Sequence, residues 1–179
     1  MSVEKTTATK KEWVRWVDKR LLISIEVPAH WTAYRNPRFE LLLMAPGQAG
    51  DRPSLVVQKS EVAASDRSIL DVVERGILDD LKPNKDFRLL DTQSITLDEI
   101  FQANLYRVGY TNSRGVRLVQ WLMLVSGGKA LFQVMATAPA TEAEELQPLI
   151  QRIFSSVRFR LKRLAQANAA LANARTNQE

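Results

Sequence analysis

Apolar residues in the second half of the chain fall in strand-length runs that two short polar stretches interrupt. Within residues 100–157 these stretches are Asn-Ser-Arg-Gly at 112–115 and Ser-Gly-Gly-Lys at 126–129. Glycine and asparagine between apolar runs are typical of tight turns. The pattern therefore predicts a three-strand meander, followed by an amphipathic helix.

Side chains alternate between the two faces of a strand, so the pattern also predicts which residues share a face. If Gly127 and Gly128 form a two-residue turn, residues whose numbers add up to 255 lie opposite each other. One face is then wholly apolar and contains Val119, Trp121, Met123, Val125, Ala130, Phe132, Val134 and Ala136. The other, which we call the mixed face, contains Leu118, Gln120, Leu122, Leu124, Leu131, Gln133, Met135 and Thr137.

The length of the first turn decides which face the preceding strand joins. A four-residue loop at 112–115 would add Phe101, Ala103, Leu105 and Arg107 to the mixed face, and Tyr106, Val108 and Tyr110 to the apolar face. A loop with an odd number of residues would swap these two sets, because a shift of one residue reverses every side chain.

The mixed face is too apolar to be fully exposed to water, so something must cover at least part of it. Two interpretations of that cover are open. A second helical layer would give an α/β/α sandwich, whereas an open groove would receive an apolar peptide or helix from a partner. The two are compatible if the cover is partial. The residues predicted to bind the partner are Leu118, Gln120, Leu122, Leu124, Leu131, Gln133, Met135 and Arg107.

The first half of the chain predicts a hairpin, two further strands, a helix and one more strand. The hairpin joins residues 13–17 to 21–27, with a short helix over 9–17 as the alternative for its first half. Strands are predicted over 39–45 and 54–62. Apolar residues that recur every four positions predict a helix after these strands. Ser65 is its predicted cap, and it ends before Pro83. Residues 87–95 are the last strand before the meander.

A second helix is predicted after Pro139, where Thr141 and Glu144 have the spacing of a capping box. Pro148 predicts a kink, or a helix that starts only near Glu145, because an interior proline costs about 3 kcal/mol. Its apolar stripe is Leu146, Leu149, Ile150, Ile153, Phe154 and Val157.

The sequence predicts three parts of the chain: a flexible basic N-terminus (1–11), one domain (12–159) and an Ala-rich helical tail (160–179).

Composition and charge narrow the class of protein. The chain has 179 residues, 45% of them hydrophobic and 25% charged, as in a soluble globular protein. The net charge of +5 divides into +3 over residues 1–20, −2 over 21–157 and +4 over 158–179. A near-neutral body argues against a nucleic-acid groove, while the basic ends could meet an acidic partner or a membrane surface. No apolar run is long enough for stable insertion into a bilayer.

Residue types that carry catalysis are scarce. The chain has no cysteine and one histidine, His30, so a His-based triad or metal site would have to use it. No nucleophile elbow, zinc-helix motif or phosphate loop is present. The sequence therefore predicts a protein that is not an enzyme and that holds no metal or cofactor; a hydrolase based on His30 is the competing hypothesis.

Short motifs add a resemblance to a known fold family. Residues 25–31, Ile-Glu-Val-Pro-Ala-His-Trp, resemble the strand-Pro-x-x-Trp opening of the PsbP-like superfamily. Ser156, Val157, Arg158 and Phe159 stand where that superfamily has a closing strand tip. Residues 53–57 and 95–98 also fall where similar segments lie. The chain is most similar to the DcrB-like branch and to the Eag chaperones of type VI secretion effectors, over roughly residues 12–159.

This resemblance implies an α+β fold, an antiparallel sheet with helices packed on it, used for binding. Eag chaperones are small, typically paired cytoplasmic proteins that shelter apolar helical segments of effectors. The leading hypothesis is therefore a cytoplasmic chaperone or adaptor, a possible homodimer, that uses the mixed face and binds no nucleic acid. The alternative is an exported PsbP-like accessory or assembly factor, periplasmic or lumenal, that docks through its basic ends.

Overall fold

A seven-stranded antiparallel sheet forms the body of the protein, with strand order β3-β4-β5-β9-β8-β7-β6. The computed structural model describes residues 12–18, 23–47, 51–61, 69–97, 101–127 and 130–159. The strands of this sheet are β3 (Thr32–Tyr34), β4 (Leu41–Met44), β5 (Ser54–Glu61), β6 (Lys85–Leu97), β7 (Phe101–Thr111), β8 (Arg117–Gly127) and β9 (Ala130–Pro139). A second sheet joins β1 (Trp13–Asp18), β2 (Ile23–Pro28) and β10 (Arg158–Phe159). The helices are α1 (Ile69–Leu81) and α2 (Ala143–Ser155).

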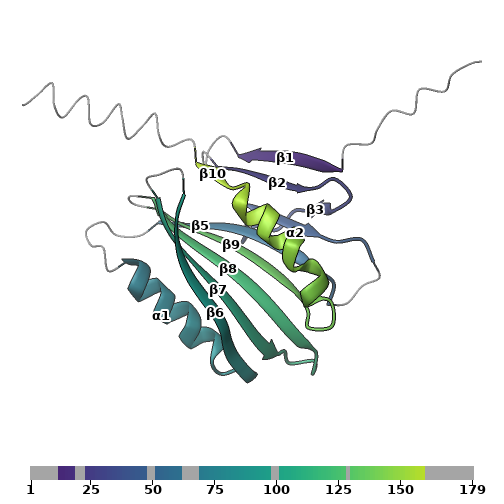
Figure 1. The fold of residues 1–179 in the computed structure, drawn as a ribbon, viewed down its shortest axis with the longest axis vertical. Coiled ribbons are helices and arrows are strands. Elements are labelled where there is room, and N and C mark those ends of the chain that lie inside the picture. Colours follow the sequence, from purple (N-terminus) through teal and green to yellow (C-terminus); the bar gives the residue numbers. More distant parts are fainter. Residues whose placement is uncertain are drawn as a thin grey trace, which may run out of the picture.

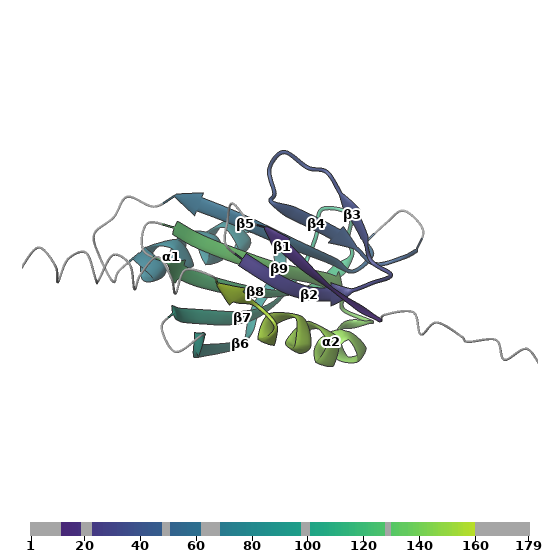
Figure 2. The same cartoon turned by 90° about the horizontal axis from the view of Figure 1, so that it is seen from above.

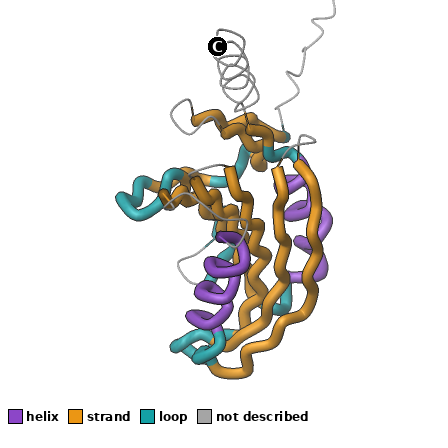
Figure 3. Tube along the Cα trace, turned by 90° about the vertical axis from the view of Figure 1, so that its left-hand side faces the viewer, coloured by secondary structure: helices purple, strands orange, loops and turns teal. Residues whose placement is uncertain are grey.

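The two helices lie on opposite faces of the large sheet, which makes the domain an α/β/α sandwich (Figures 1 and 3). Helix α2 and the three-stranded sheet cover the apolar face, and Figure 2 shows β1 and β2 lying across the strands of the large sheet. Helix α1 lies against the other face, where Ile77 packs on Tyr106, Leu122 and Leu124. The predicted fold class is confirmed, and the second helical layer is present.

The main core lies between the apolar face and its cover. Met123, Val125 and Val134 are fully buried there, and Ile150 and Ile153 of α2 pack against them. The stripe predicted for the second helix therefore points into this core. Removing this apolar surface from water supplies the main driving force for the layered packing.

The N-terminal hairpin forms as predicted, since β1 pairs with β2 from Trp13 opposite Pro28 to Asp18 opposite Ile23. The alternative, a helix in this region, is wrong for residues 13–17. The predicted strand tip is confirmed too: Arg158 and Phe159 pair with β2. The ring centroids of Phe159 and Phe132 lie 4.9 Å apart, so the end of the domain packs against β9 of the large sheet.

The register of β8 and β9 differs from the prediction by two residues. Gly127 pairs with Ala130 and Trp121 with Ala136, so opposing residue numbers add up to 257 and not 255. The turn itself, at 128–129, lies outside the described residues. The predicted faces survive this correction, because a shift of two residues keeps every side chain on its side of the sheet.

The loop between β7 and β8 has five residues, 112–116, and not four, which swaps the predicted sets. The side chain of Asn112 accepts hydrogen bonds from the N–H groups of Arg114 and Val116, and Gly115 adopts φ +80°. This local bonding closes the longer turn, which needs glycine at a positive φ. Arg107 therefore lies opposite Trp121 on the apolar face, and its predicted position on the mixed face is wrong.

Helix α2 starts differently from the prediction. It begins at Ala143, with Glu142 at the N-cap position and no side-chain cap, so the predicted capping box does not form. The start at Ala143 also excludes the later start near Glu145, and Pro148 lies inside the helix. The proline sits in the second turn, where the hydrogen bond that it cannot donate would reach the carbonyl of the exposed residue Glu144.

The remaining elements agree with the sequence in type and differ in extent. The predicted strands 39–45, 54–62 and 87–95 correspond to β4, β5 and β6, and the short strand β3 was missed. The first helix ends at Leu81, before Pro83, as predicted. Its predicted cap, Ser65, lies outside the described residues, as do the N-terminus 1–11 and the tail 160–179.

Candidate functional site

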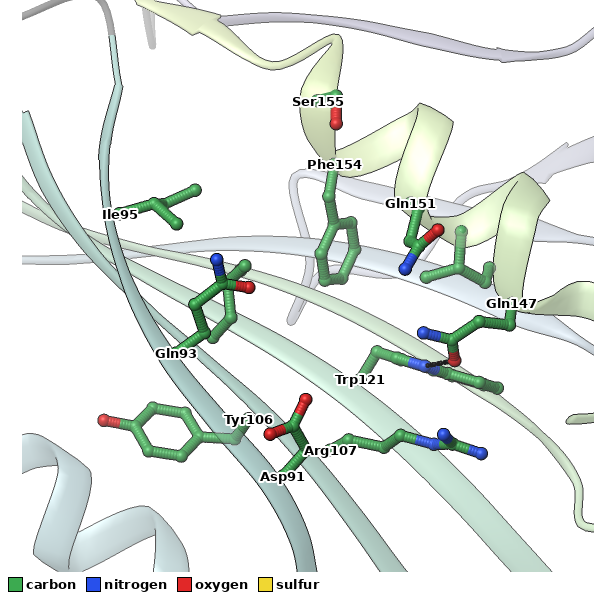
Figure 4. Close-up of a pocket in the computed structure, with 12 residues that line it drawn as sticks. Asp91, Gln93, Ile95, Tyr106, Arg107, Trp121, Gln147, Gln151, Phe154 and Ser155 are labelled. Atoms are coloured by element: carbon green, nitrogen blue, oxygen red, sulfur yellow. Dashed lines mark hydrogen bonds between the residues drawn. The ribbon is translucent and has the colours of Figure 1, made fainter. Parts of the chain in front are cut away.

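A groove of about 350 Å³ runs between α2 and the edge of the large sheet at β6, on the apolar face (Figure 4). Strands β6, β7 and β8 contribute its base and one wall, and α2 contributes the other wall. Its lining residues are Asp91, Gln93, Ile95, Leu105, Tyr106, Arg107, Trp121, Gln147, Ile150, Gln151, Phe154 and Ser155.

The base of the groove is apolar and rigid. Trp121, on β8, is 5% exposed, and its indole N–H donates a 2.7 Å hydrogen bond to Oε1 of Gln147. Ile150 and Phe154 of α2 are buried beside it, and both belong to the main core. A buried indole with a satisfied N–H holds one orientation, so the groove has a preformed apolar base.

Amide groups line both walls of the groove. Gln93 belongs to an exposed stretch of β6, and Gln147 and Gln151 lie one helical turn apart on α2. Figure 4 shows Gln93 and Gln151 entering the groove from its two sides. Each amide has both donors and an acceptor, so these walls suit a ligand with peptide-like polar groups.

Arg107 is a partly buried cation that pairs with an exposed carboxylate. Its guanidinium lies 5.8 Å from the centre of the Trp121 ring and pairs with Glu144. Its Nε is buried and has no hydrogen-bond partner among the described residues. The Arg107 side chain is 24% exposed. The Trp121 ring and Glu144 hold it in the wall of the groove.

Asp91 places a negative charge beside Arg107. It lies directly opposite Arg107 across β6 and β7, yet no ion pair joins these two described residues, because Arg107 is turned towards Trp121 and Glu144. One oxygen of Asp91 accepts the N–H of Thr92 at 2.9 Å, and the residue is exposed. Asp91 is the one acidic residue of the groove lining, and Arg107 beside it is turned towards Glu144.

Of the residues predicted to bind a partner, Arg107 alone lines this groove. Leu118, Leu122, Leu124 and Leu131 are buried on the other side of the sheet. Gln120, Gln133 and Met135 are partly exposed there, and Met135 packs near Ile77 of α1. The structure brings these seven residues together on one face as predicted, but its leucines are interior.

The sequence contains the pattern that forms the groove, but this pattern does not by itself indicate a site. Asp91, Gln93 and Ile95 alternate along a strand, and Gln147 and Gln151 are spaced i, i+4 on a helix. Each pattern alone is ordinary for a solvent-facing element. Only the packing of α2 beside β6 makes them one site.

Groups suited to metal binding are not assembled in the described parts of the chain. His30 is exposed in the turn after β2. Among the described residues, no three His, Asp or Glu side chains are placed to hold a metal ion. Neither described helix has the length and apolar character needed to cross a bilayer.

The fold is PsbP-like, as comparison with solved structures shows. The cyanobacterial PsbP protein CyanoP of Synechocystis is 14% identical with a TM-score of 0.62, and the match covers 88% of this chain and 98% of CyanoP. LpqN of Mycobacterium tuberculosis, involved in cell envelope biogenesis, is 21% identical with a TM-score of 0.60 over 75% of this chain and 81% of LpqN. The Ran-binding protein Mog1p of Saccharomyces cerevisiae is 13% identical with a TM-score of 0.57 over 82% of this chain and 95% of Mog1p.

No protein-family model and no curated protein sequence matches the chain. The resemblance inferred from the short motifs is thus confirmed at the level of the PsbP-like fold.

Proposed function

We propose that this protein is a non-enzymatic binding protein that holds a segment of a partner protein in the groove between α2 and β6. The observation that carries the proposal is the combination of a rigid apolar base, centred on Trp121, with amide walls at Gln93 and Gln151. Apolar surface supplies affinity, and a few placed polar groups orient what binds.

In its specific form, the proposal is that of a chaperone or adaptor that accompanies a secreted effector in the cytoplasm before export. The motif resemblance to Eag chaperones supports this form, and the name of Mog1p as a Ran-binding protein indicates that the same fold serves protein binding in yeast. These likenesses concern the fold, and function depends on the site that a chain builds on it.

The mixed face remains a second proposed contact surface, suited to an apolar helical segment. Its leucines are covered in the present arrangement, and Ile77 of α1 contributes to that cover. A helix could reach Leu122 and Leu124 only by displacing α1. Gln133 and Met135 are the members of this face that a partner could contact first.

Site-specific photo-crosslinking in the producing cells tests the proposal. A photo-reactive amino acid is incorporated singly at Gln151 in the groove, at Gln133 on the mixed face, and at Arg38, an exposed loop residue, as the matched control. We expect one abundant protein adduct from the Gln151 position, identified by mass spectrometry, that the control lacks.

An adduct from Gln133 alone would replace the groove by the mixed face as the binding surface. No adduct from either position, while all three variants fold as judged by circular dichroism, would overturn the binding function itself.

The charge distribution of the sequence favours a second candidate, an exported accessory or assembly factor that docks through its basic ends. This candidate is based on the net charge, which is +3 over residues 1–20 and +4 over residues 158–179 but −2 over residues 21–157. Binding by exposed charges weakens steeply with salt, whereas binding in an apolar groove does not. An unchanged yield of the Gln151 adduct when a cell lysate is brought to 0.5 M salt before irradiation would therefore exclude this candidate.

A further inference from the structure

The groove lies beside an edge of the large sheet. Strand β6 has 13 residues, and among the described strands β7 is its one neighbour in that sheet. An edge strand presents a row of N–H and C=O groups to which another extended chain can bond. The wall of the groove and this edge belong to the same strand (Figures 1 and 4).

The first part of β6 is poorly suited to pairing with another chain. Its register against β7 shifts between Lys85 and Arg88 and again between Leu89 and Asp91. Asp86 also has φ +58°. Bulges of this kind twist an edge away from regular pairing, and native sheets use them to block unwanted partners.

The second part of β6 is regular, and it is the part that lines the groove. From Asp91 opposite Arg107 to Leu97 opposite Phe101, every residue pairs with β7 without a shift. These seven residues span about 23 Å at 3.3 Å per residue. Asp91, Gln93 and Ile95, the groove residues of this strand, all belong to this regular segment.

The side chains along this segment define the chemistry of a complementary strand. The period of a strand is two, so every second side chain of an added strand would face the groove. One such side chain would meet the negative charge of Asp91. Another, four positions along, would meet Ile95 and the apolar surface near Phe154.

We propose that an extended segment of the partner protein adds to residues 91–97 of β6 as an eighth strand, at the edge beside the groove, and directs alternate side chains over β6 towards the groove. Its groove-facing side chains are a lysine or arginine opposite Asp91 and an aliphatic or aromatic residue opposite Ile95. This inference rests on the proposed binding function and specifies the conformation and charge of the bound segment.

Synthetic peptides provide the test with the full-length protein. The probe is a fluorescent ten-residue peptide in which Lys and Leu occupy the two groove-facing positions and Thr or Ser the others. Its matched controls carry Glu in place of Lys, or N-methyl groups on alternate backbone nitrogens. N-methylation removes edge hydrogen bonds while keeping every side chain, so it tests strand addition without changing the protein.

Charge reversal on the protein provides the second arm. Asp91 is exposed, so Asp91→Lys should fold normally, which circular dichroism checks. We expect it to weaken the Lys peptide about threefold to tenfold and to strengthen the Glu peptide by a similar factor, the scale of exposed ion pairs. Hydrogen exchange should slow in residues 91–97 when the Lys peptide binds.

The possible outcomes separate the strand model from the binding function. Equal binding of the N-methylated peptide, protection of α1 in place of β6, or a β6-to-β6 dimer detected by sedimentation would overturn strand addition. The binding function would then stand on the crosslink from Gln151. Absence of any peptide binding would overturn the strand model, and the proposed function itself falls only if that crosslink is absent as well.

Discussion

The indole N–H of Trp121 donates a 2.7 Å hydrogen bond to the side-chain oxygen of Gln147, joining the middle of the large sheet to helix α2. Trp121 is buried, so its N–H has no ready alternative in water. This bond orients the ring that forms the base of the groove. It also places Gln147 in the helical wall above it.

Replacing Gln147 by leucine should destabilise the protein, because it leaves a buried donor without an acceptor. We expect the free energy of unfolding to fall by about 1 to 3 kcal/mol, measured by urea denaturation followed through tryptophan fluorescence. Gln151→Leu makes the same chemical change one turn further along α2, at an exposed position, and should stay within about 0.5 kcal/mol. Equal effects of the two substitutions would contradict this assignment.

Ser156 links the end of α2 to strand β2. Its hydroxyl accepts the N–H of Glu26 at 2.8 Å and donates to the carbonyl of Ile153 at 2.6 Å. Ser156→Ala would leave the Glu26 N–H unpaired, so we expect a loss of about 1 to 3 kcal/mol in thermal or urea unfolding. Ser155→Ala, at the exposed neighbouring position, is the matched control and should be nearly neutral. If Ser155 proved the costlier site, the link would be misassigned.

Leu122 tests whether the leucines of the mixed face are interior. It is 2% exposed, whereas Leu89 on β6 is 49% exposed. Leu122→Asp loses packing and buries a charge, so we expect at least about 3 to 5 kcal/mol of destabilisation, seen as loss of the cooperative unfolding transition. Leu89→Asp should fold normally. A folded Leu122→Asp protein that has lost partner binding would instead favour the mixed face as an open contact surface.

Tyr110 predicts how stability changes at alkaline pH. Burial, and to a smaller extent the negative charge of Asp51, raises the pKa of Tyr110 above its usual value of 10.0. The native state therefore holds this proton where the unfolded chain has lost it, and stability falls as the pH rises above about 10. In urea unfolding from about pH 8 to 11, Tyr110→Phe should show a shallower fall than the wild type. Tyr34→Phe, on exposed strand β3, is the control, and an unchanged slope for Tyr110→Phe would refute the assignment.

Much of the fold follows from local sequence patterns. Glycine-marked turns separated the strands of the meander, and the stripe from Leu146 to Val157 predicted the face that α2 buries. The motif at 156–159 predicted the strand tip, whose role the structure explains through Ser156 and Phe159. These features are predictable because period and turn chemistry are properties of consecutive residues.

The site was less predictable, because it depends on one loop length and on one packing arrangement. The loop at 112–116 is one residue longer than predicted, and Arg107 therefore lies in the groove and not on the mixed face. The mixed face looked accessible in the sequence because its cover comes partly from Ile77, in a helix distant along the chain. Local pattern contains no information on which distant element will cover a face.

The sequence by itself determined which side chains of β8 and β9 lie together, since alternation survives a register shift of two residues. Tertiary structure alone decided which layer covers each face, which strand forms the edge, and that α2 packs beside β6 to leave a groove at Trp121. The reason is physical: alternation is set by backbone geometry within a strand, whereas coverage depends on how all apolar surfaces of the chain are buried together.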